Sequence, residues 1–219
     1  MELSVREERG LLGLGSVFDL SAQHDDVDAK IVAALERLSQ VFRVRLREEA
    51  WERDLSPTQA QFLIYLLYHD VELRRVSQLA REFDLTQATV SDAVASLETK
   101  GLDQREQWPE DRRVVTLRLT KDGEKLAATL SEWADPVSEH LERFPPEERE
   151  AVMHFLIGLI GSLQRSGLIT VARMCVTCRF FRQDIHPGEP SPHHCGLLDV
   201  PLGRADLRVD CPEHQPAVG

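Results

Sequence analysis

The chain lacks the features that mark several large classes of protein. Its longest uninterrupted apolar run, Phe62–Leu67, is far shorter than the roughly 20 residues that a membrane-spanning helix needs. It has no Gly-rich phosphate loop, no serine nucleophile elbow and no His-Glu-x-x-His motif, so we expect that it is not an enzyme. Acidic residues stand where a signal peptide would carry positive charge, which favours a cytoplasmic protein without a membrane partner.

Cysteine is absent from residues 1–174, and all four cysteines lie in the last 45 residues. In a reducing cytoplasm, clustered thiols are more often metal ligands than disulfides. The uneven distribution therefore predicts a separate small unit over 169–219 that binds a metal.

Positive charge is also scarce, with 26 basic against 37 acidic residues and a net charge of −11. This balance argues against non-specific adhesion to nucleic acid, but it allows a locally basic face. The 42% of hydrophobic residues is typical of a globular protein. Residues 1–23 show no sustained periodicity, so we expect a flexible arm there, followed by a main domain over 24–168.

The main domain has a mainly helical pattern with one small β-hairpin. Apolar periodicity and capping residues predict helices over 27–48, from Pro57 through the apolar run, over 76–82, from Gln87 to just before Gly101, over 121–144 and over 146–166. Between residues 101 and 121 the period changes from 3.6 to 2, which predicts strands over 102–107 and 114–119 joined by a turn.

Helix, short helix, tight turn, helix and hairpin is the order of a winged helix-turn-helix. The wing residues Gly101-Leu102-x-x-Arg105, Asp111-Arg112-Arg113 and Leu119-Thr120-x-x-Gly123 resemble the signature of the MarR family of transcription regulators. Val76-Ser77-Gln78-Leu79-Ala80, Thr86-Gln87-Ala88-Thr89-Val90-Ser91 and Leu97-Glu98-x-Lys100-Gly101 resemble its helix-turn-helix. The resemblance covers about residues 24–168 and implies a DNA-binding regulator.

The helix from Gln87 has a face suited to a DNA groove. Val90, Val94 and Leu97 share one side and should pack inward, which turns small and hydroxyl side chains outward. Near its start, Gln87 can pair with an adenine edge and Ala88 can touch a thymine methyl group. The alternative is an ordinary polar helix face. The predicted contacts to DNA are Ser77, Gln87, Ala88, Thr89, Ser91, Asp92, Lys100, Asp111, Arg112 and Arg113.

Charged side chains at the predicted interface affect how it would bind DNA. Asp92 stands where a cation is common in the family, so it either accepts a hydrogen bond from a cytosine amino group or weakens binding. Residues 100–121 carry a net charge of +2 within the acidic chain. The resemblance implies that Arg113 enters the minor groove while Asp111 orients it, whereas the alternative is a solvated hairpin tip.

The helices at the two ends of the main domain carry broad apolar faces. MarR-like proteins pair through such terminal helices, and a two-fold dimer can read a pseudo-palindromic operator with half-sites about 34–36 Å apart. The resemblance therefore implies a homodimer on double-stranded DNA, with a small-molecule effector as a further possible partner. The alternative is that both helices complete the core of a monomer.

The cysteines form the pattern Cys175-x2-Cys178, then Cys195, then Cys211. A Cys-x-x-Cys pair with two later single cysteines can complete a tetrahedral set of ligands. A zinc ribbon normally closes with a second Cys-x-x-Cys pair, whereas isolated cysteines at these gaps resemble high-potential iron–sulfur proteins. The prediction is a [4Fe–4S] cluster on Cys175, Cys178, Cys195 and Cys211.

Zinc and reversible disulfides remain alternatives to the cluster. His193, His194 and His214 lie near the later cysteines and could replace one as a zinc ligand, although we expect them to be exposed loop residues. The preferred function is a MarR-type regulator that senses redox or iron status. The alternatives are a MarR-type regulator with structural zinc that responds to a small ligand, and an electron-transfer protein.

Overall fold

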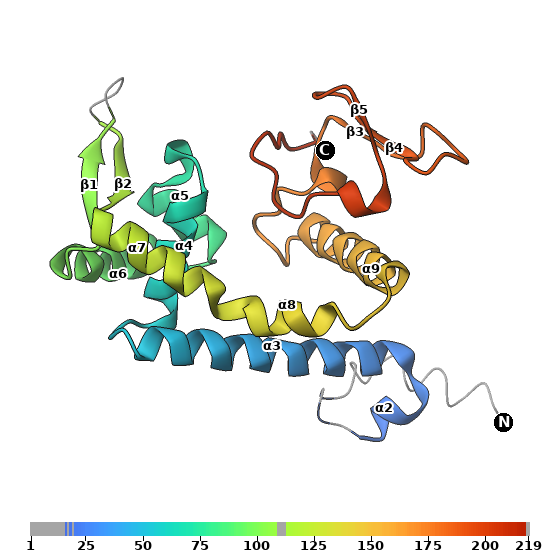
Figure 1. The fold of residues 1–219 in the computed structure, drawn as a ribbon, viewed down its shortest axis with the longest axis horizontal. Coiled ribbons are helices and arrows are strands. Elements are labelled where there is room, and N and C mark those ends of the chain that lie inside the picture. The colour runs from blue at the N-terminus through green and yellow to red at the C-terminus, as the bar shows by residue number, and fades with distance from the viewer. Residues whose placement is uncertain (1–15, 17, 19, 109–112, 218–219) are drawn as a thin grey trace. The chain divides into compact units, whose positions relative to one another are not determined.

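The computed structural model describes residues 16, 18, 20–108 and 113–217, and the chain divides into two compact units, 1–57 and 58–219. In the first unit, the short helix α2 (Ala22–Asp25) precedes the long helix α3 (Val27–Trp51) (Figure 1). The Asp26 carboxylate accepts a hydrogen bond from the Asp28 N–H and caps α3, so the helix begins where the periodicity predicts. Helix α2 thus includes the last two residues of the predicted arm, 1–23, most of which lies outside the described residues.

The second unit begins with three helices. They are α4 (Pro57–Tyr68), α5 (Val76–Glu82) and α6 (Gln87–Thr99), with the 3-10 turn η1 (Val71–Leu73) between the first two. The Thr86 hydroxyl accepts the Thr89 N–H and caps α6, and the left-handed Gly101 (φ 70°) follows its end. The predicted bounds of α5 and α6 are thus confirmed.

The wing is an antiparallel pair of strands, β1 (Asp103–Gln107) and β2 (Val115–Leu119), in which Asp103 faces Leu119. Leu117 also donates its N–H to the Arg74 carbonyl at 2.7 Å, which joins the hairpin to the segment before α5. Buried apolar side chains from α4, α5, α6, β2 and α7 form the core of this region: Phe62, Leu63, Leu66, Leu79, Val90, Val94, Leu97, Leu117, Leu119 and Leu130.

The start of α7 (Lys121–Ser131) explains the glycine of the wing signature. A Cβ atom on Gly123 would lie 1.9 Å from the Leu102 carbonyl oxygen, so only glycine fits at this close approach of two backbones. Thr120 accepts the Gly123 N–H at 3.0 Å and donates to the Gly101 carbonyl at 2.7 Å. This threonine therefore fastens the end of the wing to the end of α6.

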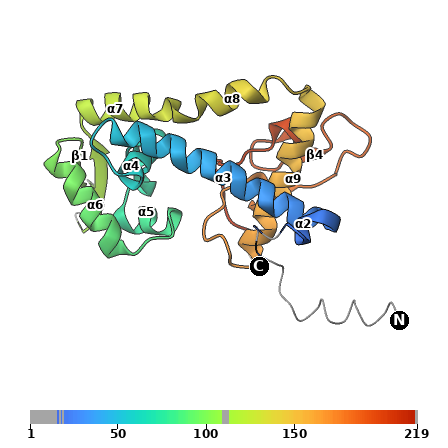
Figure 2. The same ribbon diagram turned by 90° about the horizontal axis from the view of Figure 1, so that it is seen from below.

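The predicted continuous helix over 121–144 is wrong. The structure has α7, the 3-10 turn η2 (Glu132–Ala134) and α8 (Asp135–Leu141), which follow one another along nearly one line in Figure 2. Pro136 has no N–H and its ring crowds the carbonyl four residues earlier, so the α-helical hydrogen bonding is interrupted there. Helix α9 (Pro146–Arg165) then begins and ends within a residue of its prediction.

The C-terminal module, residues 169–217, contains a small antiparallel sheet that the sequence pattern does not predict. Its strands are β3 (Phe181–Arg182), β4 (His193–Cys195) and β5 (Val200–Leu202), in that order across the sheet, with 3-10 turns η3 (Cys175–Thr177) and η4 (Arg204–Asp206). Strands of two or three residues are too short to show a period of 2, which is why the pattern did not reveal them.

Helix α9 packs against this module. Both 3-10 turns of the module contact α9, and a Cβ atom on the buried Gly161 would lie 3.1 Å from Val176 and 3.8 Å from Met174. Met174 and Leu207 are the module's buried apolar side chains, apart from its half-buried residues. Among the described residues, no helix is both long and apolar enough to cross a membrane.

Candidate nucleic-acid interface and metal centre

The exposed face of α6 carries the predicted recognition residues. Its N-terminal turn presents Gln87, Ala88 and Thr89 to solvent, and Asp92 lies one turn further along. Ser91 is half-buried, and the Thr89 hydroxyl is 2.8 Å from the capping hydroxyl of Thr86. The small side chains allow close approach of the helix backbone to a groove about 12 Å wide.

The remaining predicted contacts surround this face on neighbouring segments. Ser77 is exposed at the start of α5, Lys100 is exposed after α6, and Arg113 is exposed before β2. Asp111 and Arg112 lie outside the described residues. On the hairpin itself, Arg118 lies 3.4 Å from Glu106, and Arg105 lies 3.6 Å from Glu98 of α6. These acidic neighbours offset part of the basic charge of the wing.

Asp103 belongs to the wing by sequence, but the structure buries it to 3% exposure. Neither of its carboxylate oxygens accepts a hydrogen bond from another residue that the structure describes. Burial, reinforced by the nearby Glu98 carboxylate and only partly offset by Arg105, raises the pKa of Asp103 to about 7. This carboxyl group therefore changes its charge near neutral pH.

The four cysteines, which are separated by up to 36 positions in the sequence, line one cavity of about 30 Å³. The sheet and η3 bring them there. Cys175 begins η3 and Cys195 ends β4, while the backbone of Cys178 pairs with that of Pro216 in an isolated antiparallel β-bridge. Apart from Glu213, the rest of the lining is aromatic or aliphatic: Phe180, Phe181, Leu197, Leu198 and Leu202.

Arg208 contacts two of the sulfurs. Its backbone N–H donates to Cys175 Sγ at 3.2 Å, and its guanidinium lies 3.6 Å from Cys211 Sγ and 3.0 Å from Glu213. Burial raises the pKa of Cys175, and the neighbouring Cys195 and Cys178 raise it further, whereas the Arg208 N–H opposes this shift. The sequence analysis missed Arg208, because an arginine three residues before a cysteine is not a motif by itself.

Comparison with known proteins settles the family. A sequence model of the MarR family matches residues 53–114. The transcriptional regulator HosA of Escherichia coli O111:H- is 30% identical over 125 residues, which are 56% of this chain and 91% of HosA. The chain belongs to the MarR family. It is a transcriptional regulator of the MarR type, and its matched relatives are regulators rather than enzymes.

Two further comparisons agree with the family. The HTH-type regulator YdgJ of Bacillus subtilis, itself uncharacterized, is 29% identical over 59% of this chain and 76% of its own length. MepR of Staphylococcus aureus, in its DNA complex, is 24% identical with a TM-score of 0.53, covering 60% of this chain and 97% of MepR. The predicted MarR-like winged helix is thereby confirmed, and about two fifths of the chain lies outside each match.

The histidines near the cysteines of this MarR-type chain are not exposed loop residues, contrary to expectation. His193 is 4% exposed, because β4 places it against the Phe181 ring at 5.3 Å. His194 lies between His186 at 3.3 Å and Asp199 at 3.1 Å. His214 is half-buried and lies 3.0 Å from the Thr177 hydroxyl. None of the three lines the cysteine cavity.

The cysteine cavity differs from a site for one ion. Across residues 20–108 and 113–217, no group of three or more His, Cys, Asp and Glu side chains is arranged to hold a single metal ion. The cavity volume is nevertheless about twice what one water-sized occupant needs. The described residues thus form a cavity lined by four cysteines, without a set of side chains positioned around one ion.

Proposed function

We propose that this MarR-type regulator binds a pseudo-palindromic operator as a homodimer and senses redox or iron status through a [4Fe–4S] cluster on Cys175, Cys178, Cys195 and Cys211. The observation that carries the sensing part is the convergence of all four cysteines on one largely apolar cavity. DNA binding rests on family membership and on the exposed face of α6. The solved relative MepR binds DNA, and its fold is shared by this chain.

Exposed apolar side chains on the two terminal helices support the dimer. On α3, Val27 is 65% exposed and Leu38 is 51% exposed. On α9, Val152 and Phe155 are about half exposed, whereas Ile157 and Gly161 on another face are buried. Because apolar surface on two helices favours association, a second copy of the chain is the occupant that we expect.

The chemistry of the cavity supports an iron–sulfur cluster. Cysteine thiolates are the usual ligands of such clusters, and four suffice for one. Aromatic and aliphatic neighbours limit water access. The Arg208 backbone N–H donates to Cys175 Sγ and the Arg208 guanidinium lies near Cys211 Sγ, so both stabilise negative charge on sulfur. When bound, the cluster would supply an electron-accepting centre that oxidation or iron loss can disrupt.

The same cavity supports zinc less well. A zinc ion holds four sulfurs at about 2.3 Å from one centre. A cluster distributes its four thiolates over four iron atoms and therefore needs a wider space. A zinc ribbon normally closes with a second Cys-x-x-Cys pair, whereas this chain has single cysteines at 195 and 211, which favours the cluster.

A second candidate function is regulation by a small ligand with zinc as a structural staple. One observation favours it: a surface hollow of about 630 Å³ in the first unit, lined by residues of α3 and the segment before it, including Phe18, Leu20, Lys30 and Arg37. Its apolar and charged lining suits an amphipathic organic ligand. Zinc in the purified protein, with no visible absorbance, would favour this candidate.

The deciding experiment begins with anaerobically purified protein, whose visible spectrum and iron, sulfide and zinc content identify the bound group. Operator binding is then measured by fluorescence anisotropy for cluster-loaded, oxidised and cluster-free protein at one salt concentration. We expect affinities that differ about 5–150-fold between loaded and cluster-free protein. Equal affinities would show that the cysteine module is not a sensor.

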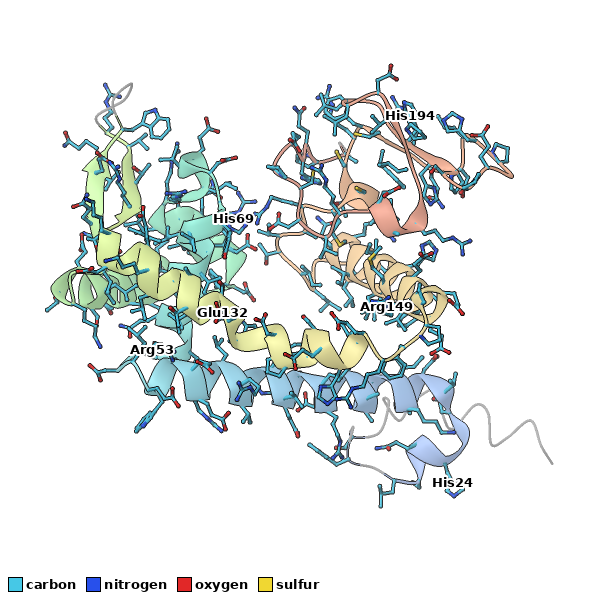
Figure 3. All side chains as sticks on the ribbon, viewed as in Figure 1. His24, Arg53, His69, Glu132, Arg149 and His194 are labelled. Carbon is cyan, nitrogen blue, oxygen red and sulfur yellow. The ribbon has the colours of Figure 1, made fainter. Side chains whose placement is uncertain are left out.

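A substitution in the wing tests the DNA-binding part. Arg113→Ala should weaken operator binding by about 1–3 kcal/mol if the arginine reads the minor groove, and by less if it touches only a phosphate. Arg149→Ala removes the same charge from α9 and serves as the matched control (Figure 3). Operator affinity that is independent of salt would contradict the assigned role of the wing.

A further inference from the structure

The cysteine module is joined to the helix-turn-helix by a group of charged side chains centred on Arg173. The Arg173 guanidinium is only 14% exposed, and it donates to both oxygens of Asp210 at 2.7 and 3.0 Å. Its third contact is an ion pair of 2.8 Å with Glu82 of α5. Such a partly buried, bidentate arginine is held more firmly than an exposed surface pair.

His69, which follows α4, completes this group. Its Nε2 lies 2.9 Å from Asp210 and 3.1 Å from the Arg173 guanidinium. Its ring stacks on Tyr65 at 3.7 Å, and Arg173 lies over the same tyrosine ring at 6.0 Å. Figure 3 shows His69 at the margin of the helix-turn-helix that faces the C-terminal module. We call Arg173, Asp210, Glu82 and His69 the clasp.

On its module side, the clasp lies close in sequence to two of the cysteines that line the cavity. Asp210 directly precedes Cys211, and Arg173 lies two residues before Cys175. The Cys211 N–H also donates to the Arg173 carbonyl at 2.8 Å, which joins the two chain segments that carry these cysteines. A group that holds Cys175 and Cys211 in the cavity therefore also holds Arg173 beside Asp210.

On its other side, the clasp reaches the helix that supports the recognition helix. Glu82 is the last residue of α5, and α5 packs against α6. The turn between them contains Phe83, whose ring contacts Tyr65 at 5.7 Å and Phe62 at 5.1 Å. A force on Glu82 or Tyr65 is thus transmitted to the turn from which α6 begins.

We propose that the clasp is the element through which the state of the cysteine site controls the recognition helix. With the site loaded, Arg173 and Asp210 form one fixed surface that holds Glu82 and the end of α5. With the site empty, Arg173 and Asp210 are no longer held in position, so Glu82 loses its ion pair and the end of α5 is no longer fixed. This route runs from Arg173 through side-chain contacts to α5, and not along the connecting residues 167–172 to α9. The inference rests on the proposed function for the identity of the bound group.

The test uses Glu82→Gln, which removes one charge of the clasp without changing any residue of the cysteine module. The protein is loaded by anaerobic reconstitution with iron and sulfide, and hydrogen exchange of residues 76–82 is compared between loaded and empty forms. In the wild type we expect exchange to rise at least tenfold when the site is emptied. In the variant it should already be high in the loaded form, with iron content unchanged.

Operator affinity is the second readout. The ratio between loaded and empty wild-type protein should fall to within about twofold in Glu82→Gln. The matched control is Asp122→Asn, which removes the same charge and an ion pair of 3.7 Å with Lys125 on the exposed face of α7. This control should keep the wild-type ratio. If Glu82→Gln fails to load, Arg173→Lys carries the test, because lysine keeps the charge but not the bidentate geometry.

The outcomes separate the clasp from the proposed function. Identical exchange of residues 76–82 in loaded and empty wild-type protein would overturn the clasp, and so would a full wild-type response in Glu82→Gln. If exchange responds to loading while operator affinity does not, the clasp stands and the proposed sensing function fails. If affinity responds and the clasp variants change nothing, sensing stands and runs by another route.

Discussion

The winged-helix region and the cysteine module are stabilised by different means. The winged-helix region encloses a core of large apolar side chains contributed by four helices and a strand. Among its described residues, the module has two buried apolar side chains, strands of two or three residues and four cysteines around a cavity. A unit of about 50 residues with so small a core needs a staple, which the cysteine site can supply. One region has an extensive apolar core, whereas the other should depend on the bound group that we propose.

The largest expected effect is on the module. Replacing any one of Cys175, Cys178, Cys195 and Cys211 with serine should abolish retention of the bound metal and expose residues 174–217 to rapid hydrogen exchange, because metal binding and folding are coupled in so small a unit. His193→Ala, which changes a buried residue outside the cavity lining, should retain the metal. Metal analysis and hydrogen exchange check both. Retention of metal by a cysteine variant would identify a histidine as the fourth ligand.

The next effect concerns the winged-helix region alone. Gly123→Ala places a Cβ atom 1.9 Å from the Leu102 carbonyl oxygen, so the wing and α7 must separate. We expect a loss of about 4 kcal/mol in the free energy of unfolding, measured with denaturant. As control, Gly158→Ala on α9 meets no atom within 4 Å and should cost nothing or stabilise the helix. Equal stability of the two variants would refute the steric role of Gly123.

A smaller effect should depend on pH. Because the pKa of Asp103 is about 7 in the fold and lower in the unfolded chain, the folded state binds the additional proton between these values. Stability should therefore fall by about 3 kcal/mol as pH rises from 5 to 8, at about 1.4 kcal/mol for each pH unit below the folded pKa. Glu98 and Arg105 are the charged groups that act on this carboxyl.

Asp103→Leu should remove this part of the pH dependence and stabilise the region most at pH 8. Thermal unfolding at pH 5 and pH 8 provides the measurement. Asp122→Asn, at an exposed carboxylate on α7, is the control that should leave the pH profile unchanged. If Asp103→Leu shows the same dependence of stability on pH as the wild type, then ionisation of Asp103 does not destabilise the fold.

The same contrast explains what could be predicted from the sequence. Helices α5, α6 and α9 and the wing were predicted nearly to the residue, because long periodic segments with caps report burial directly. The break at Pro136, the burial of Asp103 and the sheet of the module were not predicted. The break at Pro136 has a local cause in the proline itself, whereas the burial of Asp103 depends on tertiary packing and the strands of the sheet are too short to show a period.

The candidate sites divide in the same way. Cysteines separated by 16 and 15 residues were predicted to meet, and they do line one cavity. The spacing said nothing of Arg173 or Arg208, since a single arginine in a loop has no periodic partner. Only the fold brings Arg173 to Glu82, which stands 91 positions earlier. Pairings of that kind depend on tertiary structure.

The packing of the C-terminal module on α9 determines what a truncation of the chain would expose. Gly161 is buried where Val176 and Met174 approach the helix, and Glu82 and His69 receive their cationic neighbour from residue 173. A chain that ends after residue 168 would expose the surface of α9 around Gly161 to solvent. It would also leave Glu82 and His69 without the Arg173 guanidinium. The truncated protein would therefore not reproduce the empty form of the full chain, and it would differ from the loaded form as well. The module is therefore packed against its helix and cannot be removed without exposing that surface.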